Sequence, residues 1–356
     1  MTQVGLRTQM IATKSWDPIA MKLAKRGHDD YPFSINAAIL VAEVLKFLAS
    51  GVALVVELKL SSRPQRRRLL AFTWRSNVHM CVPALLYALA NYLSFVLAAL
   101  VDPGAYQTLG QLKIAMTALI FRALLRRPQT RTQWIAVGLL MSGAALASAA
   151  RGKHGTSGAV HALMRTSAAS FLVACLQSSM GSLANVYTEL LFKAAEGNSL
   201  FFQNMQLYAY GVAVLGVTLF ASEGREIARH GGLFYEWRAS TWLVAASLAS
   251  FGLSCAFVFR YLDNMLYVIA SVICIFVSAA ADGVLYGTWP DWLMMPAAGL
   301  VIFAVRLYYQ KAPEPAPAFA PVPTAEPTPA AAPVPSRASD GSKPPLPRVT
   351  TELTAS

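Results

Sequence analysis

One lysine stands inside a long apolar stretch of this sequence and could provide a centre for binding chemistry. Lys113 lies in residues 105–121, AYQTLGQLKIAMTALIF, which contain no other charged side chain. It is about eight residues, or roughly 12 Å of helix, from the start of that stretch. A charge inside a membrane normally faces a bundle interior or a watery cavity, so Lys113 predicts a binding site for an anion. The alternative is a lysine that extends to the membrane interface or is neutralised by a carboxylate.

Polar residues recur around Lys113 at helical spacing. Tyr106, Gly110, Lys113 and Thr117 are four, three and four residues apart, so a continuous helix would place them on one face. Gln111 broadens that face. A lysine supplies a compact positive charge, and tyrosine and glutamine supply oriented hydrogen bonds, so the pattern suits a phosphate or pyrophosphate. The alternative is that these side chains only join neighbouring helices.

The second half of the chain carries a matching polar pattern. Asn204 and Tyr208 are one helical turn apart, and Asn185 lies in the preceding apolar segment. An amide and a phenol on one face can read the edge of a base and stack against its ring. Ordinary bonds between helices remain the alternative for these residues.

Glu43, Lys46 and Asp282 are further ionisable residues in apolar segments. Glu43 and Lys46 are close to one helical turn apart, which favours a structural ion pair and leaves a coupling role open. Asp282 is either a proton-coupling carboxylate or a carboxylate at the membrane interface. Its place near the end of its segment favours the interface.

The sequence lacks the usual patterns of an enzyme or a metal site. It contains no paired catalytic carboxylates, nucleophile elbow, Gly-rich phosphate loop or zinc-ligand spacing. The cysteines lie in apolar segments and are expected to pack as small hydrophobic residues. We therefore expect a transporter rather than an enzyme, with no metal and no cofactor.

Composition places these residues in a membrane protein. Hydrophobic residues make up 55% of the chain and charged residues only 13%, compared with roughly 25% charged in soluble domains. Apolar segments of spanning length recur along the chain, at 35–56, 78–100, 105–125, 134–150, 167–192, 200–221, 242–261, 266–286 and 292–307. A more polar segment, 4–24, is counted as a first helix. The prediction is an all-α membrane protein with about ten transmembrane helices.

Ten spans divide into two groups of five, and an odd number per half forces the halves into opposite orientations. The expected organisation is a first five-helix repeat at 1–150, a linker at 151–166 and a second five-helix repeat at 167–311. Residues 312–356 are rich in Pro and Ala and are expected to form a disordered cytosolic tail.

Basic residues set the expected orientation. The formal net charge is +12, and the basic residues cluster in short connections between apolar segments. Anionic lipid headgroups are therefore expected as counterions, and nucleic acid is not. The arginine-rich connections at 59–75 and 122–131 should be cytosolic, which places both termini on the cytosolic side.

Several motifs, in order along the chain, resemble the nucleotide-sugar transporter family, specifically the subfamily that contains the CMP-sialic acid and UDP-galactose transporters. They are EVLKFL at 43–48, VPALLYALANYL at 82–93, DPGAYQTLGQLKIAMTAL at 102–119, NVYTELLFK at 185–193 with QNMQLYAYG at 203–211, and RYLDNMLYVIAS at 260–271. The resemblance implies the ten-helix inverted-repeat fold of drug/metabolite transporters. It also implies a Golgi membrane, with the ER as the alternative.

The resemblance assigns roles to particular residues. Lys113 and Tyr106 would contact phosphate and nucleotide, and the second half would contact the nucleotide. The expected substrate-binding residues are Lys113, Tyr106, Asn204, Tyr208, Asn91 and Asn185. Asn91 belongs to a shortened form of the family's QNN motif. Tyr267 stands where members with pyrimidine sugars typically have a second phosphate-binding lysine.

The function implied is exchange of a pyrimidine nucleotide sugar, of the UDP-sugar or CMP-sialic acid type, for the nucleoside monophosphate by alternating access. Membrane lipid is the other expected partner, and a homo-oligomer is left open. The rival hypothesis is a transport-incompetent homologue that acts as a membrane scaffold or regulator. Retention of Lys113 favours transport, and the loss of a lysine at Tyr267 favours the rival.

Overall fold

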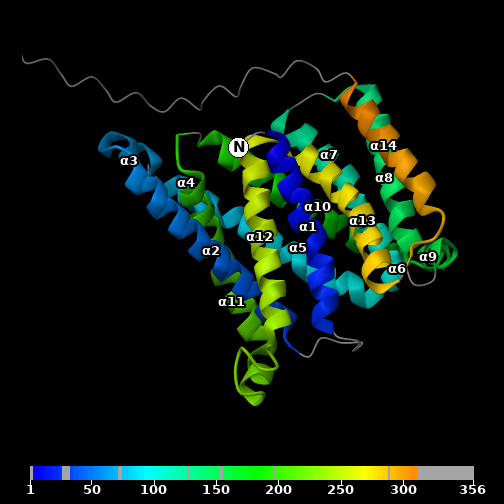
Figure 1. Ribbon diagram of the computed structural model, residues 1–356, viewed down its shortest axis with the longest axis horizontal. Coiled ribbons are helices and arrows are strands. Elements are labelled where there is room, and N and C mark those ends of the chain that lie inside the picture. Colours follow the sequence, from blue (N-terminus) through cyan, green and yellow to red (C-terminus); the bar gives the residue numbers. More distant parts are fainter. Residues whose placement is uncertain are drawn as a thin grey trace, which may run out of the picture. The chain divides into compact units, whose positions relative to one another are not determined.

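The computed structural model describes residues 3–25, 33–70, 74–126, 129–151, 155–195, 197–287 and 289–310, and within them it contains helices and no strand. Figure 1 shows the arrangement of these helices. The helices are α1 (Gln3–Lys25), α2 (Ile35–Leu60), α3 (Arg63–Leu69), α4 (Trp74–His79), α5 (Cys81–Leu100), α6 (Pro103–Leu109), α7 (Leu112–Leu125), α8 (Arg131–Arg151), α9 (Gly155–Met164), α10 (Ala168–Ala194), α11 (Leu200–Arg229), α12 (Ala239–Tyr261), α13 (Asn264–Tyr286) and α14 (Met294–Tyr309). The expected tail at 312–356 lies outside the described residues.

Eight spans in the described part of the chain are long and apolar enough to cross a membrane. They are α2, α5 extended back to Asn77, α6 with α7, α8, and α10 through α13. These spans coincide with eight of the apolar segments expected from the sequence. The ninth segment forms α14, which is shorter, and the polar first segment forms α1. A count of ten spans requires that both α1 and α14 cross the membrane. Their crossing remains a prediction.

The span that carries Lys113 is interrupted, although the sequence suggested one continuous helix. α6 ends at Leu109 and α7 begins at Leu112. At the junction, the backbone N–H groups of Gln111, Lys113 and Ile114 each bond a carbonyl three residues earlier, at 3.1, 3.4 and 3.0 Å. Such bonds tighten the helix and change its register, and glycine at position 110 weakens helical continuity there. Tyr106 and Lys113 consequently belong to different helices.

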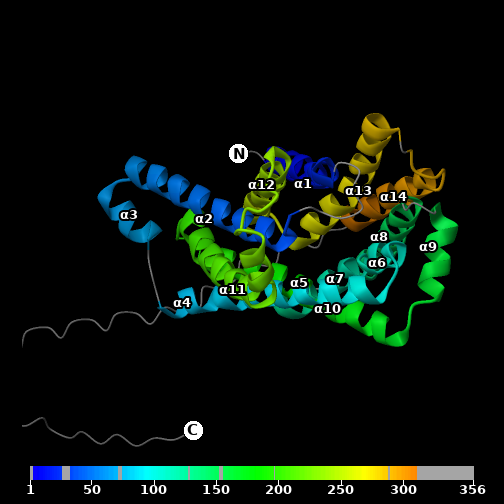
Figure 2. The same ribbon diagram turned by 90° about the horizontal axis from the view of Figure 1, so that it is seen from below.

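The two halves of the chain are interleaved. α5 packs on α10, α2 packs on α11 and α12, and α1 packs on α12 and α13, while α8 packs on α14. Figures 1 and 2 both show α2 beside α11 on one side of the molecule and α8 beside α14 on the other. Each of these contacts joins a helix from the first half to one from the second, so any space between them is lined by both halves.

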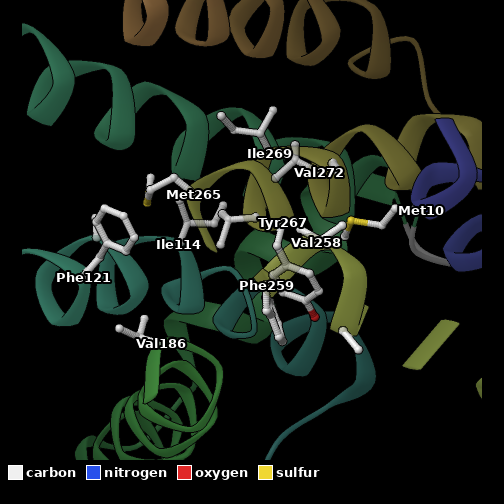
Figure 3. Close-up of a cluster of buried hydrophobic side chains, with 14 of the residues drawn as sticks. Met10, Ile114, Phe121, Val186, Val258, Phe259, Met265, Tyr267, Ile269 and Val272 are labelled. Carbon is white, nitrogen blue, oxygen red and sulfur yellow. The ribbon is translucent and has the colours of Figure 1, made fainter. Parts of the chain in front are cut away.

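The main hydrophobic core lies where α7, α10, α12 and α13 meet. It includes Ile114 from α7, Val186 from α10 and Val258 from α12, together with Met265 and Tyr267 from α13. Figure 3 shows these side chains, with the ring of Tyr267 beside that of Phe259, at 5.4 Å between ring centroids. Close packing here fixes the positions of the helices that carry the polar residues discussed below.

The linker expected at 151–166 contains helix α9, which packs on α6 and α8. The Gly/Ser-rich sequence gave no strong helical signal. Packing against neighbouring helices supplies the stabilisation that intrinsic propensity does not.

Candidate substrate site

A cavity of about 360 Å³ lies between helices from both halves of the chain. Side chains from α2, α5, α10, α11, α12 and α13 line it. Of the substrate-binding residues expected from the sequence, Asn91, Asn185 and Tyr208 are part of its wall. The cavity thus brings together residues that are more than 100 positions apart in the chain, as a substrate site built from two halves requires.

Asn185 is held in place by a tyrosine that the sequence analysis did not single out. The hydroxyl of Tyr87 donates to Oδ1 of Asn185 at 2.7 Å, and Tyr87 also lines the cavity. Asn185 is buried, and its Nδ2 has no hydrogen-bond partner among the described residues. Tyr87 and Asn91 are four residues apart on α5, and this spacing could have identified Tyr87 as part of the same face.

Lys113 lies in the first turn of α7, next to the wall of the cavity. Its Nζ is 3.4 Å from the hydroxyl oxygen of Tyr267 and 5.1 Å from the centroid of the Tyr267 ring. Tyr267 lines the cavity. Among the described residues, no carboxylate lies within ion-pair distance of Lys113. Neutralisation by a described carboxylate therefore does not explain this lysine.

Glu43 and Lys46 on α2 form the predicted ion pair, which is confirmed, and both residues line the cavity. The Nζ of Lys46 also lies 4.8 Å from the centroid of the Tyr208 ring, within the range of a cation–π interaction. Glycines leave room for this pair. A Cβ at Gly211 would lie 3.3 Å from Oε2 of Glu43, and one at Gly252 would lie 2.6 Å from Cδ of Lys46. Tyr208 in turn donates to the carbonyl of Gly252 at 3.3 Å.

The remaining polar residues near Lys113 join helices. Nε2 of Gln111 donates to the hydroxyl of Ser148 on α8 at 3.0 Å, and the hydroxyl of Thr117 lies 2.8 Å from that of Ser182 on α10. For these two residues the alternative of interhelical bonds is confirmed. Tyr106 does not line the cavity. It packs in a small cluster with Leu97 and other residues where α5, α6 and α10 meet. The tighter hydrogen bonds after Leu109 change the helical register between Tyr106 and Lys113, so the two side chains do not share the expected face.

Asp282 forms an ion pair that joins two helices. Its carboxylate lies 2.7 Å from a guanidinium nitrogen of Arg151, and the pair joins α13 to the end of α8. Among the described residues, no group of three or more His, Cys, Asp or Glu side chains could hold a metal ion.

Comparison with known proteins identifies the family. The family described as "Nucleotide-sugar transporter" matches residues 4–309. The chain belongs to the nucleotide-sugar transporter family. This is a family of transporters and not of enzymes, in agreement with the expectation from the sequence.

Relatives within the nucleotide-sugar transporter family have been named by substrate. CMP-sialic acid transporter 1 of Arabidopsis thaliana is 28% identical over 283 residues, covering 78% of this chain and 82% of that protein. The human UDP-galactose translocator is 32% identical over 283 residues, covering 78% of this chain and 69% of that protein. The fold is similar to that of a protein of known crystal structure, with a TM-score of 0.59 at 14% identity, covering 86% of this chain and 95% of that one.

Some of the motifs that resemble the nucleotide-sugar transporter family have a structural role here. Glu189 is fully buried; it accepts from Nζ of Lys193 at 2.6 Å and from the backbone N–H of Asn264 at 2.9 Å. Lys193 also donates to the carbonyl of Leu262. Asp263 caps α13 by accepting from the backbone N–H of Leu266 at 2.7 Å. This network anchors the start of α13 on α10 and so fixes the position of Tyr267 four residues beyond the cap.

Asn204 is placed differently from the other expected residues. It is fully buried on α11, one turn before Tyr208, and does not line the cavity. Neither its amide nitrogen nor its amide oxygen has a hydrogen-bond partner among the described residues. A buried amide without a partner costs about 1–3 kcal/mol, so its presence in this position calls for an explanation.

Proposed function

We propose that this chain is a Golgi membrane antiporter that exchanges a pyrimidine nucleotide sugar, of the UDP-sugar or CMP-sialic acid type, for the corresponding nucleoside monophosphate. The observation that carries the proposal is the cavity between the two halves, which combines aromatic rings, amides and an adjacent lysine. Membership of a nucleotide-sugar transporter family and the named substrates of its relatives support this class of ligand.

The wall of the cavity matches the chemistry of a nucleotide. Tyr208, Phe251 and Tyr267 offer ring faces for the base or ribose, and Asn91 and Asn185 offer amide groups for the base edge. Lys113, beside Tyr267, is the cation available to phosphate. The volume falls within the roughly 300–1,000 Å³ typical of small-molecule sites.

Asn204 and Tyr106 do not line the cavity, but we keep both as proposed substrate-binding residues. Asn204, with its unpartnered amide one turn from Tyr208, can bond substrate if α11 moves during the transport cycle. Tyr106 stands on the short helix α6, which is joined to the Lys113 helix through the break at Gly110. Discontinuous helices of this kind often form substrate sites in transporters.

The packing of the helices supports the two-repeat plan with ten spans. In chain order, the helices α1, α2, α5, α7 and α8 of the first half correspond to α10, α11, α12, α13 and α14 of the second. Exchanging each helix for its counterpart turns several of the observed helix contacts into other observed contacts. The contact of α1 with α12 becomes that of α10 with α5, and the contact of α1 with α13 becomes that of α10 with α7. The contacts of α2 with α11 and α8 with α14 map onto themselves. A two-fold relation between five-helix halves produces this pattern, and alternating access then follows from rocking of one half against the other.

The rival hypothesis of a scaffold without transport receives less support. A scaffold has no need for a polar cavity lined by both halves, and maintaining polar side chains inside a membrane bundle is costly.

Ligand binding by the purified full-length protein tests the proposal. We expect UMP or CMP, and UDP-galactose or CMP-sialic acid, to raise the apparent melting temperature, and to raise it further as the ligand concentration increases above Kd, because a ligand that binds only the folded state stabilises it. AMP and GMP serve as matched controls with purine bases. Stabilisation by none of the pyrimidine ligands, in a protein that melts cooperatively, would contradict the proposal.

A further inference from the structure

A second lysine contacts the same tyrosine as Lys113. Lys14 lies on α1, and its Nζ is 4.9 Å from the centroid of the Tyr267 ring and 5.1 Å from that of Phe251. It also donates to the hydroxyl of Ser271, one turn after Tyr267 on α13. Both rings line the cavity. Two ammonium groups from helices far apart in sequence thus both contact Tyr267, a residue of the cavity wall.

These two lysines differ from other buried or partly buried cations of the bundle. Lys46, Lys193 and Arg151 each form an ion pair with a carboxylate, and Arg260 donates to the backbone carbonyls of Phe192 and Ala195. Among the described residues, neither Lys14 nor Lys113 has a carboxylate within ion-pair distance. The charges of Glu43 and Lys46 neutralise each other, so Glu43 does not compensate the positive charges of Lys14 and Lys113. Charges in such a setting are weakly screened and favour an anionic ligand.

We infer that Lys14 is a second anion-binding cation of the substrate cavity and acts with Lys113 at the wall formed by Tyr267. This inference rests on the proposed function. The matching ligand carries two negative charges on adjacent groups. The pyrophosphate of a UDP-sugar provides them, and so do the phosphate and neighbouring carboxylate of CMP-sialic acid.

The character of α1 agrees with this role. α1 is too polar to qualify as a span by composition, yet it packs on α12 and α13 through buried residues such as Leu6 and Met10. Lys14 is one turn beyond Met10 and therefore lies on the same face of the helix, directed at α13. Both lysines are half-buried, and neither lines the cavity itself; each reaches it through Tyr267, which does.

Titration of the purified full-length protein with three probes tests the inference: UDP-galactose, CMP-sialic acid and uridine. We expect Lys14→Gln to weaken binding of at least one charged probe roughly tenfold to a hundredfold, as loss of a charge-assisted contact predicts, and to leave uridine unchanged. Lys14→Arg should restore most of the affinity. Lys59→Gln is the matched control, because Lys59 is an exposed lysine in the last turn of α2, outside the cavity.

The pattern of losses identifies the ligand. A loss for UDP-galactose alone indicates a pyrophosphate, and a loss for CMP-sialic acid alone indicates the phosphate and carboxylate pair. Unchanged affinity for both probes, or an equal loss for uridine, would overturn the inference by showing that Lys14 is structural. Lys14→Met is the second variant if Lys14→Gln does not fold, and failure of both to fold would also mean a structural lysine. If the unmodified protein binds no probe, the proposed function itself has failed.

Discussion

Two lysines at or beside the cavity lie in different electrostatic environments. Lys46 is paired with Glu43, whereas Lys113 contacts the phenol and ring of Tyr267 and has no carboxylate within ion-pair distance in the part of the chain that the structure describes. Removing an unpaired buried charge relieves a desolvation cost, whereas removing one partner of a buried pair exposes the other to that cost. Mutation of Lys113 should therefore affect ligand binding more than folding, and mutation of Glu43 should affect folding more than ligand binding.

Lys113→Ala should abolish most ligand binding and leave folding close to normal. We expect the affinity for UDP-galactose or CMP-sialic acid to fall by roughly tenfold to a hundredfold or more, because a charge-assisted contact to phosphate is lost. Titration and thermal melting of the same preparation measure both effects, with Lys59→Ala as control. A Lys113→Ala protein that melts far below the unmodified protein but binds normally when folded would mean that the lysine is structural.

Glu43→Gln should have the reverse effect. It leaves Lys46 buried without its carboxylate, and we expect a loss of stability on the order of 3 kcal/mol. The double variant Glu43→Gln with Lys46→Met removes both charges and should recover most of that loss. Thermal or denaturant unfolding in detergent measures the difference. A double variant as unstable as the single one would show that the pair does not stabilise the bundle through its charges.

The sequence predicted part of this site for sound physical reasons. Asn91, Asn185 and Tyr208 line the cavity and Lys113 adjoins it, because polar residues in apolar helices must find a polar interior. Tyr106 was grouped with Lys113 on the assumption of an unbroken helix. Lys14 could not be identified from the sequence, because its contact with Tyr267 depends on how α1 packs against α13.

At the level of helices, the sequence predicted the spans well and their internal details poorly. The apolar segments at 105–125 and 242–261 end at the same residues as the helices formed there. Hydrophobicity determines such boundaries directly. The break between Leu109 and Leu112 and the helix at Gly155–Met164 depend instead on local hydrogen bonds and on neighbours, which composition does not encode. α11 extends to Arg229, well beyond its apolar segment, because a polar helix end can continue outside the bundle.

A pair of glycines on α8 tests the contact between α8 and α14. A Cβ at Gly143 would lie 2.8 Å from Cγ2 of Val301, whereas a Cβ at Gly138 would meet nothing within 4 Å. Gly143→Ala should therefore destabilise the protein by about 1–3 kcal/mol through overpacking. Gly138→Ala on the same helix should be neutral or slightly stabilising, by up to about 1 kcal/mol. Equal melting temperatures for the two variants would contradict the packing of α8 on α14.

The molecule as a whole is organised by contacts between its halves. The helix pairs that build the cavity, such as α2 with α11 and α5 with α10, each take one member from either half. Relative movement of the halves would therefore change access to the cavity from either side, which is what alternating access requires.

The proposed topology can be tested in sealed Golgi vesicles. Ten spans and cytosolic arginine-rich connections place residues 312–356 on the cytosolic side. Protease added outside the vesicles should remove an epitope tag fused after Ser356 and leave the helical core intact. The same treatment after detergent permeabilisation serves as the control for protease activity. Protection of the tag in sealed vesicles would refute the count of ten spans, most directly at the polar helix α1.

Exchange transport by reconstituted protein tests the central claim most directly. Liposomes that contain the purified protein are loaded with UMP or CMP, and uptake of labelled UDP-galactose or CMP-sialic acid is measured from outside. The account predicts uptake for at least one matched pair, faster with the internal monophosphate than without it, and its loss in Lys113→Ala. Absence of uptake for both pairs by folded protein, or uptake that is the same with and without internal nucleotide, would contradict it.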